Sequence, residues 1–251
     1  MSATAMAVLG AVQSDGEIEV GGHAVTVNVF GLTIDLDIVW ATLFAAAVVL
    51  TLGFLMRARA TDGVPGKLQL FWEVLVEQVQ ELTDSAIGVA KGRRFVPLAV
   101  LIFLFLLICN WMEVIPNGHN PEWLPAPTSD VNLPAAMALI VIFLVHYNSI
   151  KVRGVRGYFH HYLTPYPVML PINIIEEITK PITLTFRLFG NIFASTLMIS
   201  VMVALLPIYI LPVGELIWKP FALFVGAIQA FIFALLTIIY FETAMHEEPA
   251  H

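Results

Sequence analysis

The sequence predicts an all-α polytopic membrane protein, and its composition and five long apolar segments carry that prediction. Of 251 residues, 59% are hydrophobic and 12% are charged, whereas soluble domains have roughly 45–50% and about 25%. So few charges exclude an ordinary cytosolic enzyme and a disordered chain. The net charge of −7 excludes the basic surface that nucleic-acid binding needs. The single cysteine, Cys109, excludes a disulfide framework and a cysteine-based metal site.

Five apolar segments are each long enough to cross about 30 Å of hydrocarbon as a helix. The fourth continues upstream through a polar run and exceeds one upright helix, so we expect the two C-terminal helices to be long and strongly tilted. The expected spans are about 38–56, 95–112, 133–150, 171–214 and 220–245. Residues 38–251 are then a single membrane domain. Residues 1–37 form an acidic outer segment, in which 24–36 alternates loosely, as an extended strand does.

The basic residues predict the orientation of these spans. Nine of the 12 Lys and Arg residues lie in 57–94 and 151–156, whereas the loop 113–132 holds Glu113, Glu122 and Asp130 and no basic residue. Basic loops stay on the cytoplasmic side of a membrane. The sequence therefore predicts a multi-pass plasma-membrane protein with its N-terminus outside and its C-terminus in the cytoplasm.

Residues 67–90 have the pattern of an amphipathic helix on the inner membrane surface. Its apolar residues recur at helical spacing, while its acidic residues lie mostly away from them. The apolar set is Leu68, Trp72, Leu75, Val79 and Leu82, and the acidic set is Glu73, Glu77, Glu81 and Asp84. Such a helix lies on the membrane or against a partner; a mere amphipathic connector fits the pattern equally well.

Arg187 is a charged residue in the apolar fourth segment, which has no other charge from Pro181 to Val213. A charge at the bilayer centre costs roughly 2.5–3.5 kcal/mol. One alternative is an arginine that extends to the lipid head groups. The apolar runs of the other four spans hold no Asp or Glu. Glu176 and Glu177 lie about 15–17 Å before Arg187 along a helix. We therefore infer that another subunit supplies the carboxylate partner.

A helical wheel at 100° per residue places several polar and small residues on the Arg187 face. That face holds Glu176, Lys180, Thr183, Asn191, Ala194 and Met198, and the opposite face holds Thr185, Phe189 and Thr196. The pattern predicts a wetted path on one face, with polar contacts between packed helices as the alternative. Glu176 lies in line with Arg187 and Glu177 is turned away, so Glu176 is expected to matter more. In the last span, Gln229 is placed to hydrogen-bond Arg187 or Asn191, or merely a neighbouring helix.

Two motifs of these C-terminal spans resemble the bacterial family of subunit a of F-type ATP synthases. They are Pro181–Ile–Thr–Leu–Thr–Phe–Arg187–Leu–Phe–Gly–Asn191 and Gln229–Ala–Phe–Ile–Phe–Ala–Leu–Leu–Thr–Ile–Ile–Tyr240. The segments Asp130–Val–Asn132 and Pro171–Ile–Asn–Ile–Ile–Glu176–Glu177 are also similar to that family.

The resemblance implies a proton-conducting stator subunit that faces a rotating ring of c subunits. Two offset half-channels lead to the ring, and Arg187 separates them and drives rotation. The implied proton-translocation residues are Arg187, Asn191, Gln229, Glu176 and Glu177. The implied partners are the c-ring, whose carboxylate faces Arg187, peripheral-stalk b-type subunits, the F1 sector and membrane lipid. No cofactor, metal or catalysis of its own is implied, and the sequence has no P-loop, GxSxG or HExxH motif.

The chain departs from that family at two positions. Many members carry an acid shortly after the asparagine, where this chain has Ser195 and Thr196, and some carry a histidine near Ala222. Other groups must then serve the outer half-channel, and the candidates are Glu215, Asp130, Asn132 and His146. A stand-alone ion channel or secondary transporter is the alternative function, but it needs its own substrate site and often internal repeats. A structural scaffold leaves Arg187 unexplained.

Overall fold

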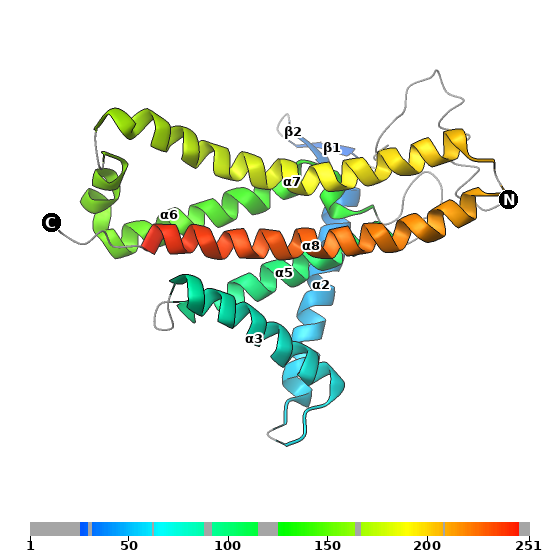
Figure 1. The fold of residues 1–251 in the computed structure, drawn as a ribbon, viewed down its shortest axis with the longest axis horizontal. Coiled ribbons are helices and arrows are strands. Elements are labelled where there is room, and N and C mark those ends of the chain that lie inside the picture. The colour runs from blue at the N-terminus through cyan, green and yellow to red at the C-terminus, as the bar shows by residue number, and fades with distance from the viewer. Residues whose placement is uncertain are drawn as a thin grey trace. The chain divides into compact units, whose positions relative to one another are not determined.

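The computed structural model describes residues 26–29, 32–61, 63–87, 92–114, 125–163, 167–207 and 209–245. The elements run in the order β1 (Thr26–Val29), β2 (Leu32–Asp35), α2 (Leu36–Arg59), α3 (Lys67–Ile87), α5 (Val96–Met112), η1 (Pro127–Ser129), α6 (Asn132–Leu163), η2 (Pro167–Met169), α7 (Leu170–Leu205) and α8 (Leu211–Met245) (Figure 1). The strands β1 and β2 pair antiparallel, which confirms extended backbone within 24–36.

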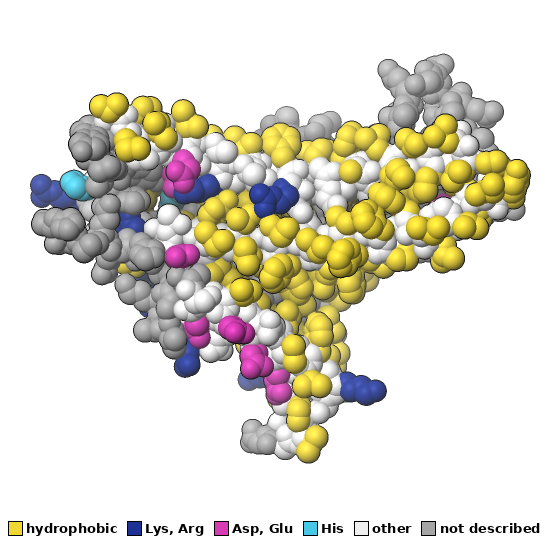
Figure 2. Space-filling model, in the orientation of Figure 1, with side chains coloured by type: hydrophobic (Ala, Val, Ile, Leu, Met, Phe, Trp, Pro, Cys, Tyr) yellow, Lys and Arg dark blue, Asp and Glu magenta, His cyan; other side chains and the backbone are white. Residues whose placement is uncertain are grey.

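Four of the described helices are long and apolar enough to cross a membrane. They are α2, α6, α7 and α8, and α5 is a shorter apolar helix of 17 residues. Hydrophobic side chains cover much of the visible surface of α7 and α8 (Figure 2). The expected helical polytopic membrane protein is thus confirmed, and α5, at about 25 Å, is shorter than the other four.

The junction between α7 and α8 differs from the expected boundaries. The expected spans end at 214 and begin at 220, but α7 ends at Leu205 and α8 begins at Leu211. Pro207 lies in this gap, where its missing N–H and its restriction of the preceding residue stop a helix. Pro220, expected to begin the last span, lies inside α8 instead. The correction makes α8 a helix of 35 residues.

The third span also differs from its predicted end at residue 150, because α6 continues past it and bends. Helical backbone continues to Leu163, but Gly154 has φ 72 and joins two helical pieces across a kink. A positive φ favours glycine because it has no Cβ to clash. The chain therefore changes direction at Gly154 while the residues on both sides stay helical.

The amphipathic helix expected at 67–90 is confirmed over Lys67–Ile87 as α3; residues 88–90 lie outside the described residues. Acidic side chains gather along α3 in the space-filling view (Figure 2). Leu70, Phe71 and Val74 are exposed, while Val79 and Thr83 are buried. An exposed apolar face beside an acidic one is consistent with a surface helix, whose membrane or protein contact stays a prediction.

Residue contacts divide the chain into two compact units. The first comprises Met1–Leu50, Phe105–Val131 and Leu188–Ala230, and the second Thr51–Leu104, Asn132–Arg187 and Phe231–His251. The borders fall inside α2, α5, α7 and α8. The expected acidic segment 1–37 lies largely outside the described residues, and the expected single domain at 38–251 stays a prediction.

In the first unit, α5 and α8 approach closely at Gly226. Asn110 Nδ2 donates a hydrogen bond to the Gly226 carbonyl at 3.0 Å, and Trp111 Nε1 donates to the Leu223 carbonyl at 3.1 Å. Thr128 Oγ1 donates to Asn110 Oδ1 at 3.2 Å. A Cβ added at Gly226 would lie 3.1 Å from the Asn110 Cβ. Only a residue without a side chain leaves both helix-to-helix hydrogen bonds undisturbed.

In the second unit, the C-terminal part of α8 is held by two other elements. The rings of Phe95 and Phe241 stack with centroids 4.3 Å apart. A guanidinium nitrogen of Arg153, on α6, donates to the Thr243 carbonyl at 3.0 Å. An aromatic and a polar contact thus fix this end of α8.

Gly226→Leu should destabilise the protein by about 1–3 kcal/mol, because the new side chain collides with Asn110 and strains a packed helix pair. Thermal unfolding of the detergent-solubilised protein measures the effect. Gly53→Leu is the matched control, since a Cβ there meets nothing within 4 Å. Equal melting temperatures for the two variants would contradict the close approach.

Candidate functional site

Arg187 lies within one continuous helix, α7, so the residues predicted to share its face do share one helix. Arg187 and Asn191 are half-buried, Ala194 is exposed, and Leu184 and Leu188 are buried. Arg187 thus stands at the border between the buried side of α7 and its exposed side. A long side chain in that position is accessible to a partner that covers the exposed side.

No hydrogen bond or ion pair joins Arg187 to any residue that the structure describes. The nearest acids upstream, Glu176 and Glu177, are engaged by Lys180 instead. Lys180 Nζ lies 2.6 Å from Glu177 Oε1 and 3.6 Å from Glu176 Oε1. Among the described residues, both of these acids therefore contact Lys180 and not Arg187.

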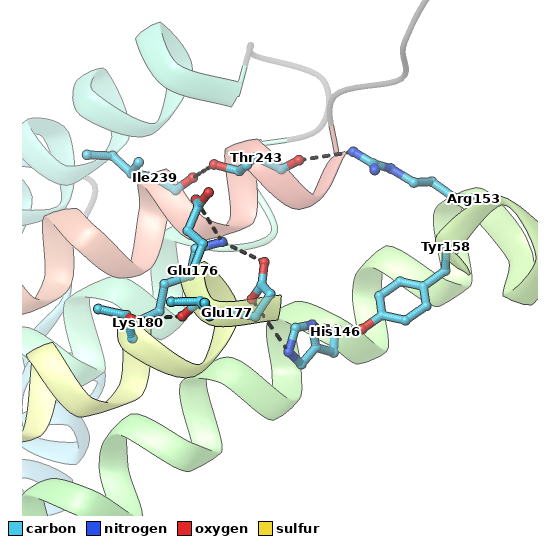
Figure 3. A network of polar contacts seen from close by, with 10 residues as sticks. His146, Arg153, Tyr158, Glu176, Glu177, Lys180, Ile239 and Thr243 are labelled. Carbon is cyan, nitrogen blue, oxygen red and sulfur yellow. Dashed lines mark hydrogen bonds and ion pairs between the residues drawn. The ribbon is translucent and has the colours of Figure 1, made fainter. Parts of the chain in front are cut away.

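Lys180 is the centre of a polar cluster in the N-terminal part of α7 (Figure 3). Its side chain is only 14% exposed, and Nζ also lies over the Tyr240 ring, 5.7 Å from the centroid. Glu177 is 25% exposed, whereas Glu176 is 65% exposed. The geometry therefore makes Glu177 the better-packed acid, although the wheel favoured Glu176.

His146 joins the same cluster from α6. Its Nε2 lies 3.7 Å from Glu177 Oε2, and its Nδ1 lies 3.4 Å from the Tyr158 hydroxyl. The sequence grouped His146 with the outer half-channel and Glu177 with the inner one, but the structure places the two side chains together. The reason is that His146 lies near the end of its span, next to the basic segment 151–156. The same orientation rule assigns that segment to the inner side.

A second polar site lies in the first unit, at the end of α5. Burial raises the pKa of the Glu113 carboxyl above its usual range, and a side-chain hydrogen bond with Ser195 partly opposes that shift. Trp218 Nε1 lies 3.4 Å from Ser195 Oγ and donates to it. Glu113 Oε1 is buried without a hydrogen-bond partner among the described atoms. A buried carboxyl with one unpaired oxygen is a group able to take up a proton.

From the sequence, Glu113 is interpreted only as one of the acidic residues of the loop 113–132. Its one distinguishing signal is that it follows the apolar run of α5 directly, after Trp111 and Met112. Ser195, its partner, precedes Thr196, the position at which the family resemblance leads one to expect an acid. The structure thus places the carboxyl of Glu113, which directly follows α5, near Ser195 of α7.

The remaining predicted residues of the first unit are separately placed. Glu215 pairs with Lys219, at 3.5 Å within α8. Asp130 follows η1. Gln229 is 8% exposed, and its Nε2 has no hydrogen-bond partner among the described atoms. A buried amide donor without a partner is costly, so Gln229 is the residue of the last span that calls for a further hydrogen-bond acceptor. In the second unit, Asn132 begins α6.

The fold defines a polytopic membrane protein, and one of its long apolar helices, α7, carries the half-buried cation Arg187. The family model described as ATP synthase A chain matches residues 38–242. The ATP synthase subunit a of Acidothermus cellulolyticus is 46% identical over 228 residues, which cover 91% of this chain and 83% of that protein. That of Mycobacterium leprae is 45% identical over 246 residues, covering 95% and 97%. That of Desulforamulus reducens is 36% identical over 229 residues, covering 89% and 85%. The chain belongs to the ATP synthase subunit a family.

Glu113 should react with a hydrophobic carbodiimide more readily than Glu215 at neutral pH. Carbodiimides attack the protonated carboxyl, and a raised pKa enlarges the protonated fraction, so labelling of Glu113 should fall as pH rises. Peptide mass spectrometry of the labelled chain measures both sites in one sample. Glu215, which pairs with Lys219, is the internal control. Stronger labelling of Glu215 than of Glu113 would contradict the burial of a protonatable Glu113.

Proposed function

We propose that this chain is the proton-conducting stator subunit of the membrane sector of a rotary ATP synthase. The observation that carries the proposal is Arg187, a half-buried cation in an apolar stretch of α7 with no ion pair among the described residues. Membership of the ATP synthase subunit a family supports it. The chain itself makes and breaks no covalent bond; it moves protons for the complex.

The partner of Arg187 is a carboxylate of the c-ring. Removing a guanidinium from water costs several kcal/mol, and only a carboxylate with good geometry offsets that cost. The exposed side of α7 offers small and flexible residues, Ala194 and Met198, that allow a close helix. Each ring carboxylate is neutral in lipid and ionises when it meets Arg187. Arg187 thus separates two half-channels and makes proton flow turn the ring.

Two groups of polar side chains fit the two half-channels. Glu177, with Lys180 and Glu176, serves the inner one, and His146 belongs with them. The outer one uses Glu113 and Ser195, together with the earlier candidates Glu215, Asp130 and Asn132. Asn191, one turn after Arg187, and Gln229, with its unpaired amide, line the region where the ring carboxylate is exchanged.

The basic segments 57–94 and 151–156 face the cytoplasm in this proposal. The N-terminus then lies outside the bacterial plasma membrane and the C-terminus inside it. Peripheral-stalk b-type subunits and, through the complex, the F1 sector are the further partners. The acidic face of α3 lies on the side where those soluble parts assemble.

Arg187→Ala should abolish ATP synthesis and ATP-driven proton pumping while leaving the complex assembled. Arg187→Lys should also fail or nearly fail, because a lysine releases its proton more easily and lacks the planar fork of a guanidinium. Dye-quenching assays on inverted membrane vesicles measure pumping, and subunit content measures assembly. Normal growth on oxidative phosphorylation with Arg187→Ala would overturn the proposal.

Cysteines at Asn191 or Ala194 should form disulfides with cysteines placed beside the ring carboxylate. Cysteines at Phe189 or Thr196, on the opposite side of α7, should not. The native Cys109 is buried and is first changed to Ser to clear the background. Gel analysis of oxidised membranes detects the products. Cross-links from Phe189 or Thr196 alone would show that another side of α7 faces the ring.

A further inference from the structure

We propose that His146 is the proton-relay residue of the half-channel at the Lys180 end of α7, passing protons between Glu177 and water. This inference rests on the proposed function and names a group that carries the proton on that side. It follows from three features of the cluster: the imidazole has an acidic neighbour on one nitrogen, a hydroxyl on the other, and partial access to solvent.

The imidazole bridges two elements that the sequence does not bring together. Nε2 faces Glu177 of α7 at 3.7 Å, and Nδ1 faces the Tyr158 hydroxyl at 3.4 Å. Tyr158 follows His146 by 12 residues, which would be about 18 Å along a straight helix. The kink at Gly154 (φ 72) turns the chain back, and Figure 3 shows Tyr158 pointing at His146. The same rings also meet edge to face, with centroids 5.9 Å apart.

Histidine is the side-chain type that gains and loses a proton near neutral pH, whereas a carboxyl at neutral pH holds one only briefly. In the transfer, protonated Glu177 gives its proton to Nε2 of neutral His146, leaving a carboxylate and an imidazolium. The imidazolium then gives a proton to water, directly or through Tyr158, whose hydroxyl accepts one proton and donates another. The reverse sequence loads the channel during ATP-driven pumping.

The charges around His146 are compatible with reversible protonation of its imidazole. Glu177 is shared between His146 and Lys180, and Glu176 also contacts Lys180. With both acids ionised and Lys180 charged, these three side chains sum to −1, and protonation of His146 brings the sum to zero. Arg153, on α6, is engaged by the Thr243 carbonyl of α8, and Tyr240 of α8 lies beneath Lys180. His146 is 29% exposed, so its imidazole is not sealed inside the chain, and in this proposal water has access to it.

The test uses membrane vesicles that hold the complete complex, followed by removal of F1 and measurement of passive proton flux. His146→Gln keeps hydrogen-bonding capacity but cannot be protonated, so flux near neutral pH should fall by about tenfold or more. The variant should also lose the part of the pH profile that follows histidine titration. His146→Ala should show the same loss, and added imidazole should restore much of its flux by acting as a mobile carrier.

His160→Gln is the matched control, because His160 is an exposed histidine on the same helix. It should leave flux, pH profile and imidazole response unchanged. Glu177→Gln should reduce flux more than Glu176→Gln, since only Glu177 contacts His146. Only variants with wild-type subunit content are compared, and where the alanine variant lacks assembled complex the pH profile of His146→Gln decides.

Two results would overturn the relay. One is wild-type flux with an unchanged pH profile in His146→Gln. The other is a flux loss in His146→Ala that imidazole does not relieve, which would assign His146 a role in positioning Glu177. Both results leave the proposed function standing if Arg187→Ala still abolishes coupling. Coupled synthesis in Arg187→Ala would instead remove the proposed function itself.

Discussion

The rest of the structure depends on one constraint: a guanidinium is held in an apolar helix without an acid of its own among the described residues. A permanent internal ion pair would satisfy Arg187, but a buried pair contributes little net stability against an apolar replacement. In the proposed function, an arginine without a fixed partner has a different value, because it can pair with successive carboxylates at similar free energy. The fold supports this by keeping α7 continuous through Arg187, with buried Leu184 and Leu188 anchoring one side and the other side left exposed.

The positions of Lys180 and Arg187 along α7 explain why Glu176 and Glu177 form no ion pair with Arg187. Lys180 lies two helical turns away, about 10 Å along the axis, and binds both Glu176 and Glu177. Each long acidic side chain therefore has a closer cation than Arg187. Lys180 also lies over the Tyr240 ring, which helps to keep its side chain only 14% exposed. One lysine thereby holds both acids away from Arg187, which in the proposed function leaves the guanidinium free for a partner subunit.

Local pattern sufficed for the helices, and for placing Arg187 inside an apolar helix, because apolar length, charge placement and helical spacing are properties of neighbouring residues. Prediction failed where the outcome depends on one backbone angle or on contacts between distant segments. The break at Pro207 was misplaced because several prolines compete in 207–220, and Pro181 and Pro220 are accommodated inside helices. The meeting of His146, Tyr158 and Glu177 depends on a positive φ at Gly154, which no periodicity reveals. Glu113 was overlooked because its burial depends on contacts with distant parts of the chain, such as Ser195, which lies 82 positions later in the sequence.

This chain has Thr196 and Ala222 where members of the family that it resembles often carry an acid and a histidine. A side chain from another part of the sequence can take over such a role if the fold brings it to the same place. A proton path requires a protonatable oxygen or nitrogen within hydrogen-bond reach of the next group, and it does not require that group on a particular helix. Ser195, adjacent to Thr196, accepts a hydrogen bond from Trp218 Nε1, and its side chain also lowers the pKa of the Glu113 carboxyl against the effect of burial. A carboxyl at the end of α5 thus reaches the same turn of α7 that an acid at 196 would occupy. Glu113 lies outside α7, so α7 keeps an uncharged side chain at Thr196. In the proposed function, an uncharged surface toward the ring imposes less electrostatic drag than a carboxylate fixed on α7.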